Sequence, residues 1–122
     1  MIKVIIAGSR GFNDYEELCL TCDKFLGGKE VQIVSGTARG ADKLGERYAK
    51  KQGFPIKEFP ANWNKHGKSA GYIRNSEMAD YADVLIAFWD DKSRGTKHMI
   101  DLAKQKGLKV IIVSYNYKKD QE

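Results

Sequence analysis

The stretch "IKVIIAGSRGFNDYEELCLTCDKFLGG", residues 2–28, decides the fold class. It begins with a β-branched apolar run at 2–8 that ends in glycine, as is typical of a buried strand. An amphipathic segment follows at 14–28, with Asn13-x-x-Glu16 or Asp14-x-x-Glu17 as its capping box and a glycine pair at its end. Together these segments predict one βα unit.

The same alternation continues along the chain. Further strands are predicted at 31–36, 55–61, 83–90 and 108–115, and further helices at 39–53, 69–82 and 95–107, with an irregular stretch before the third helix. The first, fourth and fifth strands are almost continuously apolar, which is typical of a parallel sheet covered on both faces. The third strand carries two prolines, which place it at an edge. We therefore predict an α/β fold: a single three-layer, doubly wound (Rossmann-like) domain over residues 1–115, with a five-stranded parallel sheet, helices on both faces and a short frayed tail at 116–122.

Composition limits the class of protein. The chain has 122 residues, 42% of them hydrophobic, which suits one domain with a real core. The apolar start at 1–8 is too short for a signal sequence, and no apolar run reaches the roughly eighteen residues that a membrane span needs. We expect a cytoplasmic protein with no membrane partner. The formal charge of +5 favours an anionic partner, such as a phosphate, a nucleotide or nucleic acid, without choosing among them.

The cysteines and histidines predict neither redox chemistry nor a metal site. Cys19 and Cys22 form a C-x-x-C in mid-helix, where the helix dipole does not activate a thiol, so a core role is expected. His66 and His98 have no partners at ligand spacing. We expect no metal and no cofactor.

Ligands of a doubly wound sheet bind beyond the carboxyl ends of the strands, at the point where the winding reverses. Three of the four loops that follow the first four predicted strands combine glycine with arginine and a hydroxyl. The candidate ligand-binding residues lie in these loops and at the start of the third helix: Gly8, Ser9, Arg10, Phe12, Ser35, Gly36, Thr37, Arg39, Gly40, Asp42, Arg74, Asn75, Trp89, Arg94, Gly95 and Thr96.

Two familiar nucleotide motifs are incomplete. The Gly-Lys-Ser at 67–69 lacks the glycine five residues earlier that a P-loop needs, because that position is Asn62, so Ser69 is expected only to cap the third helix. The first turn is Gly-Ser-Arg-Gly rather than G-x-G-x-x-G, and the second strand ends in Ser35 where a ribose-binding acid would stand. A P-loop NTPase and a standard NAD-dependent dehydrogenase are therefore both disfavoured.

Glycine-containing loops open the second and fourth helices. The loops at 36–42 and 94–96 would present unpaired N–H groups with a partial positive charge, which suit phosphate or ribose oxygens. The arginines of these loops could add charge-assisted hydrogen bonds. Phe12, Trp63 and Trp89 lie in the same loops, so one of them could stack on a base.

Several ordered motifs resemble a known family. "GSRGFNDY", "VSGTARGAD" and "FPANWNKHGKSAGYIRNSEMADYADVLIAFWDDKSRGT" resemble the YspA/cpYpsA-related (YAcAr) branch of the SLOG superfamily, over about residues 2–113. The resemblance implies a doubly wound fold that binds nucleotides or nucleotide-derived ligands, in bacterial and phage genomes. It also implies a homodimer or a higher homo-oligomer.

A more distant resemblance is to the lonely-guy phosphoribohydrolases, which cleave the N-glycosidic bond of cytokinin nucleotides. Arg74-Asn75 resembles their R-K dipeptide, and the segment 93–96 resembles the phosphate-binding part of their P-G-G-x-G-T-x-x-E motif. The position of that glutamate is Met99 here, and Asp101 lies two residues further on. The loss of such an electrostatic stabiliser argues against the same hydrolysis.

A second distant resemblance is to the DNA-processing protein A family, which binds single-stranded DNA. The segment 35–42 resembles its SG-x-A-x-G-x-D turn, and an R-N-R stretch of that family lies near the position of Arg74-Asn75. Loop aromatics and basic charge would suit a single strand.

Three hypotheses follow. The first is a protein that senses or sequesters a nucleotide or a nucleotide-derived small molecule, with Arg74 and Asn75 as the orienting polar pair. The alternative is an N-glycosidic hydrolase of nucleotides or NAD-like molecules that uses Arg74 with Asp42, Asp90 or Asp91. The third is single-stranded nucleic acid binding.

Overall fold

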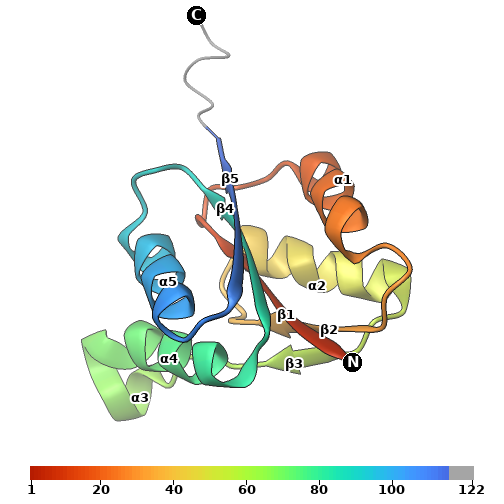
Figure 1. The fold of residues 1–122 in the computed structure, drawn as a ribbon. Coiled ribbons are helices and arrows are strands. Elements are labelled where there is room, and N and C mark those ends of the chain that lie inside the picture. The colour runs from red at the N-terminus through yellow and green to blue at the C-terminus, as the bar shows by residue number, and fades with distance from the viewer. Residues whose placement is uncertain (116–122) are drawn as a thin grey trace, which may run out of the picture.

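A computed structural model describes residues 1–115, so the frayed tail expected at 116–122 lies outside the described residues. The elements in chain order are β1 (Ile2–Gly8), α1 (Tyr15–Leu26), β2 (Val31–Ser35), α2 (Ala41–Gln52), β3 (Ile56–Glu58), α3 (Trp63–His66), the short 3-10 helix η1 (Gly67–Ser69), α4 (Ala70–Tyr81), β4 (Val84–Trp89), α5 (Arg94–Gln105) and β5 (Lys109–Ser114). Figure 1 shows α1 and α2 on one side of the sheet and α4 and α5 on the other. The predicted three-layer α/β fold is confirmed.

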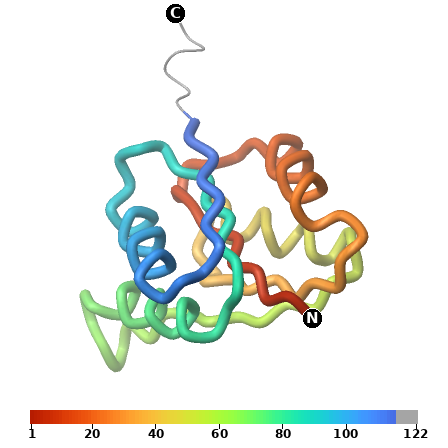
Figure 2. Tube along the Cα trace, in the orientation of Figure 1, coloured from red at the N-terminus to blue at the C-terminus, as the bar shows by residue number. Residues whose placement is uncertain are grey.

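The sheet is parallel throughout, in the order β3-β2-β1-β4-β5. The chain first winds from β1 out to β3 and then crosses back over β1 to reach β4. Figure 2 shows this crossing, which runs through the green segment that contains α3 and α4, on the other side of the sheet from α2. The winding therefore reverses between β1 and β4, and β3 is an edge strand as its prolines predict.

The apolar run of β1 supplies both cores. Val4 and Ile6 pack with α1 and α2 on one face, whereas Ile5 and Ala7 pack with α4 and α5 on the other. All four side chains are buried, because successive side chains of a strand point to opposite faces. This explains why the strand is apolar without alternation. β5 differs because it is the other edge strand, and Ile112 is 40% exposed there.

Helix α1 begins with the second of the two predicted capping boxes. The Asp14 carboxylate accepts a hydrogen bond from the Glu17 backbone N–H at 3.1 Å. Cys22 is fully buried in the core, as predicted, and burial raises the pKa of its thiol to about 12. A thiol held protonated in this way is unreactive.

The stretch expected to be irregular is ordered. It forms α3 and η1, and α3 is capped by the Asn62 side chain, which accepts a hydrogen bond from the Lys65 N–H at 3.1 Å. The predicted side-chain cap at Ser69 is wrong, because η1 leads directly into α4 and Ser69 already has a helical backbone. One turn of helix is too short to leave an apolar periodicity in the sequence.

Strand β3 is also shorter than predicted. It spans only Ile56–Glu58, and Pro55 and Pro60 lie outside it.

Among the described residues, no helix is long and apolar enough to cross a bilayer.

Helix α2 lies unusually close to β1 at Gly45. A Cβ added there would lie 2.8 Å from both Cβ and Cγ2 of Ile6. We expect Gly45→Ala to lower the free energy of unfolding by about 1–3 kcal/mol through overpacking, despite the better helix propensity of alanine. Urea denaturation measures the change.

Gly71→Ala is the matched control, because the nearest atom to its added Cβ is 3.8 Å away, on Trp63. That variant should be neutral or more stable by up to about 1 kcal/mol. Equal effects of the two substitutions would contradict the close approach.

Candidate functional site

A pocket of about 250 Å³ opens beyond the carboxyl ends of the strands, where the winding reverses between β1 and β4. The end of β1 forms its floor, and the first turns of α2 and α5 and one face of α4 form its walls. Its lining residues are Ala7, Gly8, Arg10, Ala38, Asp42, Trp63, Lys68, Gly71, Tyr72, Arg74, Asn75, Met78, Ser93, Gly95, Thr96 and Met99. We call it the central pocket.

A second hollow of about 340 Å³ adjoins the central pocket. It lies over the β2–α2 loop and the segment after β3, and we call it the loop hollow. The two share Arg10, Ala38, Trp63 and Arg74 in their linings. Arg74 and Arg10 therefore stand at the boundary between two connected spaces.

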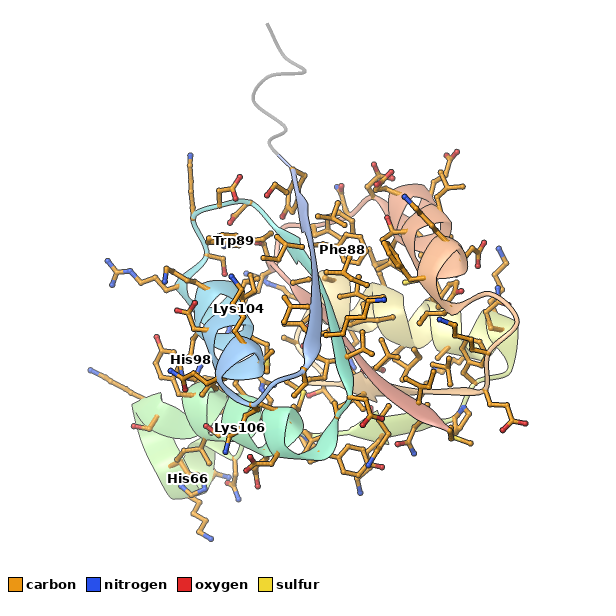
Figure 3. The ribbon with its side chains drawn as sticks, viewed as in Figure 1. His66, Phe88, Trp89, His98, Lys104 and Lys106 are labelled. Atoms are coloured by element: carbon orange, nitrogen blue, oxygen red, sulfur yellow. The ribbon has the colours of Figure 1, made fainter. Side chains whose placement is uncertain are left out.

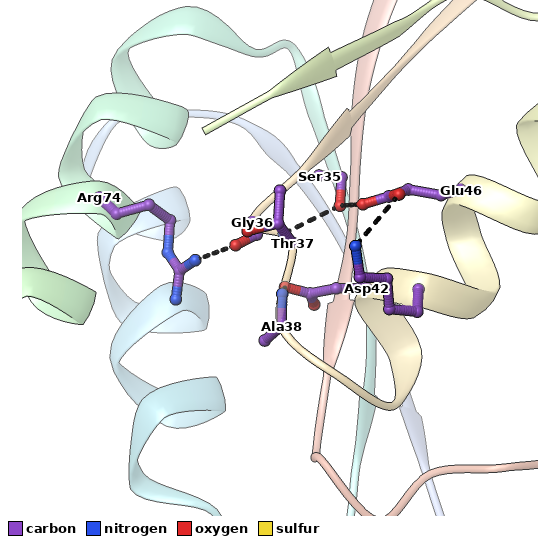
Figure 4. A network of polar contacts seen from close by, with 8 residues as sticks. Ser35, Gly36, Thr37, Ala38, Asp42, Glu46 and Arg74 are labelled. Carbon is purple, nitrogen blue, oxygen red and sulfur yellow. Dashed lines mark hydrogen bonds and ion pairs between the residues drawn. The ribbon is translucent and has the colours of Figure 1, made fainter. Parts of the chain in front are cut away.

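The Arg74 side chain bridges two elements that are far apart in sequence. Its Nη1 donates a hydrogen bond to the Gly36 carbonyl in the β2–α2 loop (Figure 4), and its Nε donates to Asn75 Oδ1 at 3.0 Å. Burial lowers the pKa of this guanidinium, although Asp42 opposes the shift. An arginine remains charged under these conditions. The two hydrogen bonds fix the direction in which this cation faces the pocket.

Gly36 is the residue that makes room for this arrangement. A Cβ at position 36 would lie 2.7 Å from Arg74 Nη1 and 2.8 Å from Asp42 Oδ2. Real Cβ atoms do not approach other atoms so closely, so any side chain here would displace both charged groups. The guanidinium and the carboxylate thus converge over a single glycine.

Asp42 stands in the first turn of α2 and is only 6% exposed. Its Oδ2 accepts a hydrogen bond from the Ala38 N–H at 3.1 Å. Burial raises the pKa of this carboxyl to about 6, against the effects of the Ala38 N–H and the Arg74 charge. A buried acid beside a cation in a cleft is the arrangement often found at functional sites.

A buried polar network of Ser35, Thr37 and Glu46 supports the β2–α2 loop (Figure 4). Ser35 Oγ donates to Glu46 Oε2 at 2.6 Å and accepts from the Thr37 N–H at 3.0 Å. Thr37 takes the left-handed conformation, with a φ of 65°. The loop then turns again at Gly40, where φ is 81° and a Cβ would lie 2.5 Å from the Ser9 carbonyl oxygen. These contacts give the loop one conformation.

The β4–α5 loop is held by Asp90. Its Oδ1 accepts from the backbone N–H groups of Ser93 at 2.7 Å and Lys92 at 2.9 Å. Burial raises the pKa of Asp90, but these N–H groups and Ser9 outweigh that effect, so the pKa lies below its usual value. Ser93 in turn caps α5, because its Oγ accepts from the Thr96 N–H at 3.4 Å.

Asn75 joins α4 to the start of α5. Its Nδ2 donates to the Gly95 carbonyl at 3.4 Å and contacts His98 Nδ1 at 3.2 Å, while its Oδ1 faces Arg74. Burial lowers the pKa of His98, which favours the neutral imidazole that this contact needs. Asn75 is thus a buried connector at the back of the pocket.

Comparison with known proteins identifies the family. The sequence model of the YspA, cpYpsA-related SLOG family matches residues 2–66. The Gene 61 protein of Mycobacterium phage D29 is 36% identical over 119 residues, which cover 91% of this chain and 95% of the phage protein. The chain belongs to the YspA, cpYpsA-related SLOG family.

Solved structures with this SLOG fold include two with low sequence identity. DNA processing protein A from Helicobacter pylori, which binds single-stranded DNA, has a TM-score of 0.70 at 20% identity; the match covers 98% of this chain and 70% of that one. A predicted subunit of a tRNA methyltransferase from Methanocaldococcus jannaschii has a TM-score of 0.50 at 18% identity, over 97% of this chain and 73% of that one. These two likenesses concern the fold, whereas membership of the family suggests a nucleotide-binding or nucleic-acid-binding role.

The sixteen candidate ligand-binding residues predicted from the sequence fall into four groups. Those that line the central pocket are Gly8, Arg10, Asp42, Arg74, Asn75, Gly95 and Thr96, and those that line only the loop hollow are Gly36, Thr37 and Arg39. Three residues line neither space but make contacts that hold the surrounding loops, namely Ser9, Ser35 and Gly40. Phe12, Trp89 and Arg94 lie outside both spaces.

These last three residues have other roles. Phe12, in the loop after β1, is 2% exposed and stacks on Phe88 in the core, with 4.7 Å between the ring centroids. Trp89, labelled in Figure 3, donates its Nε1–H to the Ser93 carbonyl at 3.0 Å and packs against the core cluster that contains Met99 and Ile100 of α5. Of the three aromatics considered for stacking, Trp63 alone lines the central pocket. Arg94 is exposed and faces outward.

Sequence reasoning missed one wall of the pocket. Lys68, Gly71, Tyr72 and Met78 are not among the predicted site residues, yet they line the central pocket with Arg74 and Asn75. Their spacing of three or four residues is the helical signal that could have found them, had one face of α4 been followed from Arg74. Met99, at the position of the lonely-guy glutamate, also lines the pocket.

The buried Asp42 carboxyl predicts a pH-dependent stability. Because its pKa is raised to about 6 from a usual value of 3.8, the folded state holds this proton more tightly than the unfolded state does. The ionised Asp42 carboxylate therefore destabilises the folded state most above pH 6. This destabilisation decreases as the pH falls to about 4.

We expect Asp42→Asn to stabilise the protein above pH 6 by up to about 3 kcal/mol and to change nothing at pH 4 or below. Urea denaturation of both proteins across this pH range measures the difference, which isolates Asp42 from the other acids. A constant difference between the variant and the parent would contradict the raised pKa.

Proposed function

We propose that this SLOG protein binds a nucleotide or a nucleotide-derived small molecule in the central pocket. The observation that carries the proposal is the meeting of the α2 and α5 N-termini with Arg10 and Arg74 at the point where the winding of the sheet reverses. Such a place offers partial positive charge from the helices and full charge from the arginines to a single anionic ligand.

The start of α5 suits the phosphate. Ser93, Gly95 and Thr96 line the pocket there, and the first N–H groups of a helix have no partners within the helix. Arg10 and Arg74 on the other side can add charge-assisted hydrogen bonds, which are shorter and stronger than neutral ones. Gly95 leaves the backbone open, because no atom lies within 4 Å of an added Cβ.

The apolar groups of the lining suit a base. Met78 and Met99 are buried apolar side chains of the lining, and the rings of Trp63 and Tyr72 stand at the mouth. A flat aromatic ligand packs well between thioethers and aromatic rings. One small pocket thus combines polar groups for a phosphate with apolar groups for a base. A protein with this site would sense or sequester its ligand without demanding chemistry.

Hydrolysis of an N-glycosidic bond is the second candidate, and one observation favours it. Of the three acids considered for this role, Asp42 lines the pocket beside Arg74, whereas Asp90 is held by backbone N–H groups and Asp91 accepts from Ser114 Oγ at 3.1 Å. Met99 carries no charge to stabilise an oxocarbenium-like transition state. The balance favours binding without cleavage.

Arg74 should be the residue on which affinity depends. We expect Arg74→Ala to weaken binding of nucleoside mono- and diphosphates by roughly 10- to 100-fold or more, because the variant has no charged donor at this position. Lys68→Ala should cost much less, since an exposed lysine is screened by solvent. Calorimetric titration of both variants measures this, with the melting temperature as a check on folding. Equal losses of affinity in the two variants would contradict the role of Arg74 and would favour phosphate binding by the Gly-Lys-Ser segment.

The ligand should stay intact. We expect chromatography to find no free base after the protein is incubated with AMP, GMP, CMP, UMP or NAD. Base release that Asp42→Asn abolishes would replace the binding proposal with the hydrolase.

A further inference from the structure

A third hollow lies outside the central pocket, over the groove between α4 and α5. It measures about 330 Å³ and is lined by Tyr72, Arg94, Lys97, His98 and Asp101. Tyr72 belongs to its lining and to that of the central pocket. We call it the outer hollow, and it contains two cations that the nucleotide site does not use.

The hollows form a series, and an aromatic side chain stands at each junction. Trp63 lines both the loop hollow and the central pocket, and Tyr72 lines both the central pocket and the outer hollow. These two rings are 54% and 46% exposed, which makes them two of the few large hydrophobic side chains on the described surface. Exposed aromatic rings beside a basic surface are the platforms on which unpaired bases stack.

The series is also the basic part of the surface. Its three linings contain six cations, Arg10, Arg39, Lys68, Arg74, Arg94 and Lys97, against two carboxylates, Asp42 and Asp101, a net of +4 where the whole chain has +5. Lys97 shares its charge with Asp101 through an ion pair at 2.9 Å. Cations spread along a groove match a ligand whose phosphates are also spread out.

The Tyr72 ring is held in place. It packs edge-on against the His98 ring at 4.4 Å between centroids, and His98 Nδ1 in turn contacts Asn75 Nδ2 at 3.2 Å. A ring that is ordered before binding loses little entropy when a base stacks on it.

We infer that a single strand of nucleic acid binds along this series, with one nucleotide in the central pocket and its neighbours stacked on Trp63 and Tyr72. The inference goes beyond the proposed function and shares its central pocket. A duplex does not fit the arrangement, because its bases are already stacked on each other and present no face to the rings. The outer hollow and the loop hollow would then hold backbone phosphates.

The test separates the strand from the single nucleotide. Fluorescence anisotropy with labelled oligo-dT and oligo-U of about 12 nucleotides measures the strand, and calorimetry with AMP and UMP measures the pocket alone. We expect the oligonucleotides to bind more tightly than the mononucleotides and more tightly than a duplex of equal length, with an affinity that falls as salt rises.

The double variant Arg94→Ala/Lys97→Ala gives the sharper result. It should weaken oligonucleotide binding by roughly tenfold at low salt and reduce the salt slope by about 0.7 for each phosphate that the protein no longer neutralises, while mononucleotide affinity is unchanged. The charge-matched control, Lys51→Ala/Lys104→Ala, removes two exposed lysines outside the series; Lys104 is seen on α5 in Figure 3. It should leave both affinities as they are.

Each outcome is decisive. If mononucleotides bind but oligonucleotides bind no more tightly, or if the two double variants behave alike, the strand inference is wrong and the nucleotide site stands. If oligonucleotides bind as expected and no mononucleotide does, the inference stands and the proposed small-molecule function fails.

Discussion

The hydrogen bond from Arg74 to the Gly36 carbonyl is the interaction on which the site depends. It joins α4, which covers one face of the sheet, to the loop before α2, which covers the other. Asp42 from α2 and Arg74 from α4 come together there, over Gly36. Without this hydrogen bond the central pocket and the loop hollow would lose the wall that they share, and Asp42 would lose the cation that moderates the burial of its charge.

This arrangement costs stability in a way that is typical of sites built for ligands. Asp42 is buried with a raised pKa, and Arg74 is buried enough to lower its own. Hydrophobic residues of similar size would fold more easily there, because burying charge is unfavourable even when the charges are paired. The rigid elements around the site offset this cost: β1 lies between two parallel neighbours, and both faces of the sheet are covered by helices.

The Gly-Lys-Ser segment at 67–69 contributes to the central pocket, although it is not a P-loop. Its comparison with a P-loop correctly drew attention to this part of the chain, because Lys68 does line the central pocket. The preceding residues form α3 rather than a phosphate-binding loop, with Trp63 at the mouth of the pocket. The short helix left no periodic pattern, so the sequence could not predict it. Arg74 follows in α4, and it lines the same pocket as Lys68.

The sequence by itself determined the order of the strands and helices, the parallel sheet and the edge at which the glycine and arginine loops gather. These follow from local patterns: apolar runs, helical periodicity, capping residues and prolines. Only the tertiary structure decided which loop residues face the pocket. Phe12 packs in the core, whereas Trp63 lines the pocket. Asp90 accepts hydrogen bonds within its own loop, whereas Asp42 lines the pocket beside Arg74. The physical reason is that the direction of a side chain depends on neighbours that are distant in the chain, such as Phe88 for Phe12 and Gly36 for Arg74.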